Sequence, residues 1–163
     1  MPHARPTTDR AKESLFNILN QSYDLEEVMI LDLYGGLGSM AFEFYSRGAQ
    51  VTTVEVNRKS ISYIIDIAKN LGADITIKQA KVLQFLKRET SRYDIIFADP
   101  PYNAGSEIQK LVTSISEGDY LKEAGLFILE HQSMTQVKHP AISEIREYGQ
   151  SSFSFFKFAD NDE

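Results

Sequence analysis

Short apolar runs alternate with stretches of helical periodicity along most of the chain. An apolar run bounded by turn residues is typical of a buried strand. Such strands are expected at residues 28–34, 50–56, 74–78, 93–98 and 125–130. Apolar residues spaced along one helix face predict helices at residues 7–20, 39–47, 60–71, 82–88 and 106–115. Strands that alternate with helices in this way predict a parallel sheet with helices on both faces.

The last part of the chain departs from this alternation. Residues 142–148 and 152–158 have the character of two further strands joined around Gly149, which predicts an antiparallel hairpin. The whole pattern therefore predicts an α/β, Rossmann-like fold with a seven-stranded, mostly parallel sheet. Ligands of such sheets bind beyond the carboxyl ends of the strands, where the strand order reverses. We therefore expect the functional site in the loops after the first, second and fourth strands.

Length and composition fit one globular domain. The chain has 163 residues and a mass of 18.5 kDa, and 42% of its residues are hydrophobic, which is ordinary for a domain that buries a core. No apolar run is long enough to span a bilayer, and the first residues lack the layout of a signal peptide. Cysteine is absent and the three histidines are scattered, so we expect a cytoplasmic protein without disulfides, membrane contact or a metal site.

The overall charge of the chain is acidic. There are 17 Lys and Arg against 23 Asp and Glu, which gives a net charge of −6 and a pI of about 5.1. Because phosphates are bound mainly by cationic side chains, this balance argues against a protein that holds nucleic acid mainly by bulk positive charge. A small group of basic residues nevertheless precedes the first glycine-rich segment, at Arg5, Arg10 and Lys12.

A glycine-rich segment follows the first predicted strand. It runs from Asp32 to Gly38 and reads DLYGGLG. Glycines such as Gly36 and Gly38 let the backbone turn sharply and approach a ligand closely. A Gly-x-Gly pattern is weak evidence by itself, because it fits a plain strand-to-helix turn as well as the loose dinucleotide-binding pattern GxGxxA.

An acidic residue closes the second predicted strand. Glu55 lies 23 positions after Asp32. A carboxylate at this strand end accepts hydrogen bonds from ribose hydroxyls in Rossmann-like sheets, whereas the alternative is a solvated strand end. Together with the glycine-rich segment, Glu55 favours a nucleoside-binding role.

The sequence Asp99-Pro100-Pro101-Tyr102 follows the fourth predicted strand. Tandem prolines fix the backbone and end a strand, but a turn requires neither the aspartate nor the aromatic residue. The exocyclic amine of a base is a poor nucleophile, since its lone pair is delocalised into the ring. An aspartate and a backbone carbonyl that accept its two N–H bonds would localise the lone pair, while an aromatic ring would stack on the base. The motif therefore favours methyl transfer to such an amine.

These segments together resemble the RsmD family of class I, S-adenosylmethionine-dependent methyltransferases, which methylate the exocyclic N2 of a guanine in small-subunit ribosomal RNA. The resemblance spans nearly the whole chain and implies one methyltransferase domain over residues 1–163, with a helical segment over residues 7–21 at its start. Besides the motifs above, it rests on Arg5-Pro6-Thr7-Thr8-Asp9, Lys12-Glu13, Leu15-Phe16-Asn17, Glu43, Ser46-Arg47-Gly48-Ala49 and Val54-Glu55.

The resemblance also implies which residues meet the cofactor, S-adenosylmethionine. Asp32 would orient its methionine end, and Glu55 would take its ribose hydroxyls. The implied cofactor-binding set is Asp32, Tyr34, Gly36, Gly38, Glu55 and Val82.

On the substrate side, the resemblance implies a catalytic set of Asp99, Pro100 and Tyr102. Asp99 and the Pro100 carbonyl would hold the guanine amine, and Tyr102 would stack on the base. Arg5 and Thr7 would lie near the mouth of the site and face cofactor or RNA. The implied partner is ribosomal RNA or the small ribosomal subunit.

The chain departs from the family's pattern at several places. Leu37 stands where a small hydroxyl residue is usual, and Gly35 where a small side chain is usual. Ala80-Lys81 replaces an acidic or amide residue that commonly meets the adenine amine, so backbone groups near Val82 would take that role. Only residues 1–4 precede the Arg-Pro-Thr segment, so the family's basic N-terminal hairpin is expected to be absent and RNA binding by the chain alone to be weak.

The residues leave other functions open. DNA adenine-N6 and other exocyclic-amine methyltransferases share the Asp-Pro-Pro-Tyr motif, although the DNA enzymes normally carry a further target-recognition region. Protein glutamine methylation is usually associated with Asn in place of Asp99. An NAD-dependent dehydrogenase would use the same glycine loop but needs a substrate domain. A degenerate methyltransferase fold used as a binding module is the non-enzymatic alternative, which Leu37 and Lys81 favour and the three intact acids oppose.

Overall fold

The computed structural model describes residues 8–101 and 105–158 of the chain. The helices are α1 (Asp9–Ser22), α2 (Ser39–Ser46), α3 (Arg58–Leu71), α4 (Val82–Arg88) and α5 (Gly105–Glu117). The strands are β1 (Met29–Leu33), β2 (Gln50–Glu55), β3 (Thr76–Gln79), β4 (Tyr93–Ala98), β5 (Leu121–Gln132), β6 (Ile142–Tyr148) and β7 (Ser151–Phe156).

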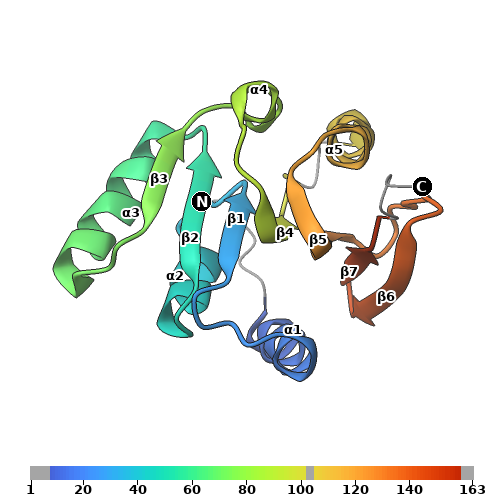
Figure 1. Ribbon diagram of the computed structural model, residues 1–163, viewed down its shortest axis with the longest axis horizontal. Helices are drawn as coiled ribbons and strands as arrows, with labels where there is room; N and C mark the ends of the chain where they lie inside the picture. The colour runs from blue at the N-terminus through green and yellow to red at the C-terminus, as the bar shows by residue number, and fades with distance from the viewer. Residues whose placement is uncertain (1–7, 102–104, 159–163) are drawn as a thin grey trace.

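One seven-stranded sheet forms the centre of the molecule (Figure 1). Its strand order is β3-β2-β1-β4-β5-β7-β6. Strands β1 to β5 pair in parallel, and β7 lies antiparallel between β5 and β6. This confirms the predicted Rossmann-like fold, the mostly parallel sheet and the C-terminal hairpin. Because β1 has β2 on one side and β4 on the other, the strand order reverses between β1 and β4.

Helices cover both faces of this sheet, with α1 and α2 below it and α4 and α5 above it in Figure 1. The side chains of successive residues of β1 point to opposite faces of the sheet, as expected for a strand. Ile30 packs with the core on the α1 and α2 side, and Leu31 packs with the core on the α4 and α5 side. The central strands are therefore apolar on both faces, which is why they read as continuous apolar runs.

Capping residues and a left-handed glycine set the ends of α1 and α3. Thr8 caps α1 as an N-cap residue, and its Oγ1 accepts a hydrogen bond from the Ala11 N–H at 3.2 Å. Asn57 does the same for α3, since its Oδ1 accepts from the Ser60 N–H at 3.0 Å. This cap starts α3 at Arg58, two residues before the predicted start at residue 60. Gly72 ends α3 with a φ of +63°.

Strand β5 is longer than the predicted strand at residues 125–130. It begins at Leu121 and ends at Gln132. Its first part contains Lys122 and Glu123 and a left-handed Ala124 with a φ of +61°, and the pairing with β4 is irregular there. This part of the strand could not be predicted from an apolar pattern, because it contains polar residues and a local irregularity. Among the described residues, no helix has the length and apolar character needed to cross a membrane.

Candidate active site

The glycine-rich segment forms a tight loop between β1 and α2. The Gly35 N–H donates to the Val54 carbonyl on β2 at 2.9 Å, and the Gly38 N–H donates to the Gly35 carbonyl at 2.9 Å. Gly38 has a φ of +88°, and a Cβ placed there would lie 2.8 Å from the Phe42 ring. Residues with side chains are strained in this conformation, so Gly38 is required by the turn itself. Leu37 points outward and is 45% exposed.

Gly35 lies so close to β2 that there is no space for a side chain at this position. A Cβ on Gly35 would lie 2.1 Å from Thr53 Oγ1. Thr53 is fully buried on β2 and lies beside Asp32 in the register of the sheet. The hydroxyl of Thr53 therefore occupies the space that a side chain at position 35 would need.

Asp32 is a buried acid on β1. It is 1% exposed, and its Oδ2 accepts a hydrogen bond from Thr53 Oγ1 at 3.0 Å. Burial raises the pKa of Asp32 to about 7, the Thr53 hydrogen bond opposes this rise in pKa, and the negative charge of Glu55 adds to it. Removing an acid from water disfavours its charged form. Asp32 therefore changes its charge near neutral pH.

Glu55 ties together the loops that follow β1 and β2. Its Oε1 accepts from the Gly36 N–H at 2.9 Å, and its Oε2 accepts from the Asn57 N–H at 2.6 Å. A carboxylate has about four acceptor sites, so both oxygens keep the ability to accept a further hydrogen bond. The Glu55 carbonyl also accepts from the Ala80 N–H at 3.1 Å, which brings the loop after β3 to the same place.

Asp99 follows β4 immediately and lies next to the end of β1. Its N–H donates to the Leu33 carbonyl at 3.2 Å. Burial raises the pKa of Asp99 well above its ordinary value, and the negative charges of Glu130 and Asp32 raise it further. The next residue, Pro100, is buried, whereas Pro101 is exposed.

Glu130 is a site residue that the sequence motifs did not identify. It is 5% exposed on β5, one position beyond Leu129, the partner of Ala98 on β4. This register places Glu130 beside Asp99, in agreement with its effect on the pKa of Asp99. An acid at the end of an apolar strand is the signal that marks it, the same signal that identified Glu55.

The side chains of Tyr34 and Val82 have structural roles. Tyr34 has a φ of +62°, and its hydroxyl donates to Glu107 Oε2 on α5 at 2.6 Å. Burial and Glu107 raise the pKa of Tyr34 above its ordinary value. Val82 starts α4, and its side chain is buried in the core. Only the backbone of Val82 is therefore placed to meet a ligand.

The structure brings the acids of four neighbouring strands to one edge of the sheet. They are Glu55 on β2, Asp32 on β1, Asp99 after β4 and Glu130 on β5. Three other predicted site residues, Arg5, Thr7 and Tyr102, lie outside the described residues. Within the described part of the chain, no group of three or more His, Cys, Asp or Glu residues is arranged to hold a metal ion.

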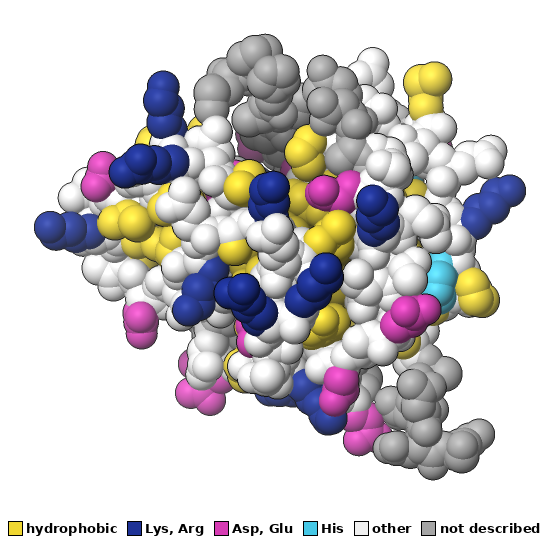
Figure 2. Space-filling model, turned by 90° about the horizontal axis from the view of Figure 1, so that it is seen from above, with side chains coloured by type: hydrophobic (Ala, Val, Ile, Leu, Met, Phe, Trp, Pro, Cys, Tyr) yellow, Lys and Arg dark blue, Asp and Glu magenta, His cyan; other side chains and the backbone are white. Residues whose placement is uncertain are grey.

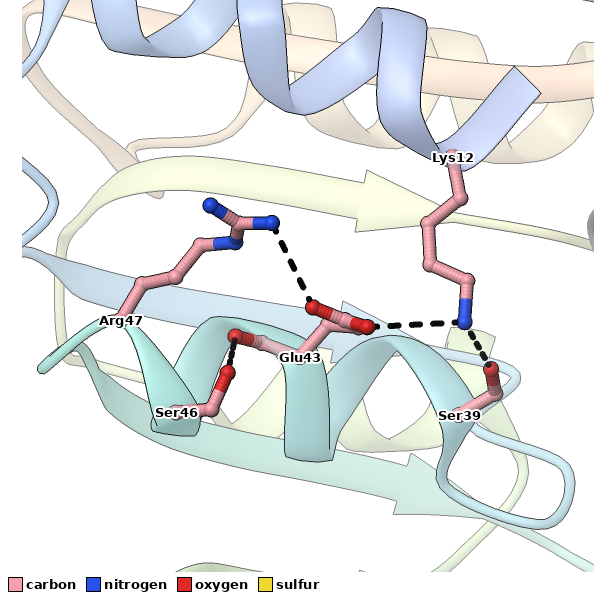
Figure 3. Close-up of polar contacts among 5 residues, drawn as sticks. All are labelled: Lys12, Ser39, Glu43, Ser46 and Arg47. Carbon is pink, nitrogen blue, oxygen red and sulfur yellow. Dashed lines mark hydrogen bonds and ion pairs between the residues drawn. The ribbon is translucent and has the colours of Figure 1, made fainter. Parts of the chain in front are cut away.

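A second polar cluster joins α1 to α2 beside the glycine loop (Figure 3). Glu43 lies between two cations, with Lys12 Nζ at 3.7 Å and Arg47 Nη2 at 3.6 Å. Lys12 Nζ also donates to Ser39 Oγ at 3.2 Å, and Ser46 Oγ donates to the Glu43 carbonyl at 2.7 Å. Of these residues, Lys12, Glu43, Ser46 and Arg47 contributed to the resemblance, and the contacts of Lys12 add a polar link between α1 and α2.

Comparison with known proteins gives one family over nearly the whole chain. The family described as "Conserved hypothetical protein 95" matches residues 1–157. Two relatives named "Ribosomal RNA small subunit methyltransferase D" align well. The Haemophilus influenzae protein is 33% identical over 135 residues, or 77% of this chain and 67% of its own length. The Buchnera aphidicola protein is 29% identical over 131 residues, or 79% and 66%. The chain thus spans about two thirds of these relatives.

Solved structures agree with this assignment. A protein from Escherichia coli named "Putative methyltransferase yhhF" is 25% identical, with a TM-score of 0.84 over 98% of this chain and 90% of its own. The S-adenosylmethionine-bound magnesium protoporphyrin IX methyltransferase of Synechocystis is 12% identical, with a TM-score of 0.68 over 92% of this chain and 79% of its own, and it shares the fold. The chain belongs to the family of conserved hypothetical protein 95, the RsmD family, as its motifs indicated.

Proposed function

We propose that this chain is an S-adenosylmethionine-dependent methyltransferase that acts on the exocyclic N2 amine of a guanine in small-subunit ribosomal RNA. The names of the relatives support methyl transfer to small-subunit ribosomal RNA, and membership of the RsmD family supports the guanine N2 amine as its target. The observation that carries the proposal is the pairing of two acids at the reversal of strand order: Asp32 is buried near the end of β1, and Asp99 is partly buried directly after the adjacent strand β4. A ribosomal substrate places the protein in the cytoplasm, with the small subunit or its RNA as partner.

The residues at this edge fit S-adenosylmethionine by their chemistry. When bound, the cofactor supplies an electrophilic methyl group on a positively charged sulfur. Asp32, Asp99 and Glu130 give the edge an excess of acid, which suits a ligand that carries positive charge. Glu55 has acceptor sites left for ribose hydroxyls, and the loop at Gly36 has no side chain that would fill the approach. The set Asp32, Tyr34, Gly36, Gly38, Glu55 and Val82 holds the cofactor in this proposal.

Asp99, Pro100 and Tyr102 act on the amine. Asp99 and the Pro100 carbonyl accept the two N–H bonds, so that the nitrogen lone pair is directed toward the methyl group, and Tyr102 stacks on the base. Positioning the reacting groups in this way can lower the activation free energy of the transfer substantially. The amine loses its proton readily once it is methylated, so Asp99 need not be a strong base. From the family resemblance, we assign Arg5 and Thr7 to contacts with cofactor or RNA.

The surroundings of Asp99 favour its protonated form. Burial and the negative charges of Glu130 and Asp32 hold the pKa of Asp99 high. A carboxyl group keeps acceptor capacity when it is protonated, so Asp99 can accept an N–H bond of the amine in either form.

The test is the variant Asp99→Ala in methyl transfer to small-subunit particles that lack the modification. We expect transfer to be lost while calorimetry finds cofactor affinity nearly intact. Asp66→Ala, which removes an exposed acid on α3, is the matched control and should keep both properties. Full activity of Asp99→Ala would overturn the mechanism, and transfer to adenine in DNA instead of guanine in RNA would overturn the substrate.

A further inference from the structure

Exposed basic side chains gather on the side of the sheet that α4 and α5 cover. Figure 2 looks onto this side from above and shows them across its middle. We define the basic face by five exposed residues: Lys78 on β3, Lys81 at the N-cap of α4, Lys87 and Arg88 in its last turn, and Lys110 on α5.

The charges of the basic face are largely uncompensated. Within the described part of the chain, none of its five residues takes part in an ion pair. The adjacent acid, Glu89, has its carboxylate engaged by the Tyr93 hydroxyl at 2.7 Å and by the Thr90 N–H at 2.9 Å. On α5, Glu107 accepts from Tyr34. The cations of the face are therefore available to an external anion.

The basic face also runs against the overall charge of the chain. Between residues 78 and 92 there are five basic residues and one acidic residue, although the whole chain has an excess of six acids. Much of the acid lies elsewhere, and some of it is buried at the candidate active site, as for Asp32 and Glu130. Exposed cations concentrated on one face produce a positive surface potential there, whatever the net charge of the molecule.

The basic face begins at the edge of the candidate active site. Lys81 follows Ala80, whose N–H is bonded to the Glu55 carbonyl. From Lys81 the face follows α4 to Arg88, seven positions later, which is a rise of about 10 Å. Lys78 joins it from β3, because it is in register with Val54, whose side chain packs on the same side of the sheet.

We propose that the basic face docks the phosphate backbone of the RNA whose guanine is methylated at Asp99. This inference rests on the proposed function and identifies the surface that holds its substrate. Exposed lysines and arginines bind phosphates without reading sequence, so they position the RNA while the site selects the base. The alternative anion, a membrane surface, is disfavoured because α4 and α5 carry no exposed large hydrophobic residue among those described, and interfacial helices need one.

The test compares two triple variants of equal charge change. The basic-face variant is Lys78→Gln/Lys87→Gln/Arg88→Gln, which leaves Lys81 beside the site unchanged. The matched control is Lys69→Gln/Lys138→Gln/Lys157→Gln, three exposed lysines on other parts of the molecule. Binding to protein-free small-subunit ribosomal RNA is measured by filter binding over a series of KCl concentrations, and S-adenosylmethionine affinity by calorimetry.

The basic-face variant should bind the RNA about tenfold more weakly or worse, with a salt slope reduced by about 2 to 3. The control should stay within about twofold of wild type, and cofactor affinity should be unchanged in both. Equal RNA binding by the two variants would overturn this inference alone. Loss of binding to phosphatidylglycerol vesicles with RNA binding intact would also overturn it. Wild-type protein that neither binds nor methylates RNA would overturn the proposed function as well.

Discussion

Asp32 occupies its buried position at a cost to stability. Its pKa is raised from 3.8 to about 7 by burial, and a shift of this size corresponds to up to about 4 kcal/mol. For an acid whose pKa is higher in the folded state, the favourable contribution is full below about pH 4. It is lost as the pH rises through about 7. A residue held so unfavourably is typical of a binding site, where function outweighs stability.

The variant Asp32→Asn separates these two effects. It should unfold with the same free energy as wild type near pH 4 and with a higher free energy at pH 8, by up to about 4 kcal/mol. Urea unfolding at both pH values measures this difference. The matched control is Asp66→Asn, which makes the same substitution at an exposed acid on α3. If wild type and Asp32→Asn have the same pH dependence, Asp32 is not the buried, high-pKa acid described here.

Glu55 supports both the loop and, in our proposal, the ribose. Glu55→Ala should therefore weaken S-adenosylmethionine binding by about 1–3 kcal/mol, the usual effect of removing a charged hydrogen-bond acceptor. Isothermal calorimetry measures the affinity, again with Asp66→Ala as the control. Unchanged affinity in Glu55→Ala would remove the ribose role.

At the scale of elements, the strands and helices could be predicted because both faces of the sheet are covered. Strand β4 agrees in both bounds with its apolar run at 93–98. The start of β5 could not be predicted, since Lys122 and Glu123 interrupt the pattern. Within the site, Asp32 and Asp99 could be predicted as site residues because each begins a recognisable motif at a strand end. Thr53 could not be assigned, because its contact with Asp32 depends on the register of two strands.

The close approach of β2 to the glycine loop makes a prediction about Gly35. Gly35→Ala places a Cβ against Thr53 Oγ1 and should destabilise the protein by about 1–3 kcal/mol, as overpacking usually does. In a Thr53→Ala background the same change should be much milder, because the clashing oxygen is gone. Chemical denaturation of the four proteins completes a double-mutant cycle. An equal effect of Gly35→Ala in both backgrounds would refute the proposed clash.

Helix α1 is held to α2 mainly by apolar packing. The rings of Phe16 and Phe44 meet edge to face at 4.9 Å, and the Arg47 guanidinium lies 4.2 Å from the Phe16 ring centre. Phe16→Ala should cost about 3–5 kcal/mol. Glu43→Gln, which removes the charge between Lys12 and Arg47, should cost less than about 1 kcal/mol because the pairs are partly exposed. Thermal and urea unfolding compare the two, and a larger loss for Glu43→Gln would contradict this ranking.

At the scale of the whole molecule, charge is separated rather than uniform. The net charge of −6 contributes to our expectation of weak RNA binding by the chain alone, which stays a prediction. The fold buries acids such as Asp32 and Glu130 at one edge of the sheet and exposes cations such as Lys87 and Arg88 on one face. This arrangement could not be predicted from composition, because a count of charges does not say which of them are exposed or where.

In our proposal, this edge of the sheet transfers a methyl group to a guanine amine of small-subunit ribosomal RNA. The most direct measurement incubates the protein with labelled S-adenosylmethionine and unmethylated small-subunit particles, then identifies the labelled nucleoside by mass spectrometry after digestion. We expect label in N2-methylguanosine with wild-type protein and none with Asp99→Ala. Label in another nucleoside or in protein, or equal labelling by Asp99→Ala, would contradict it.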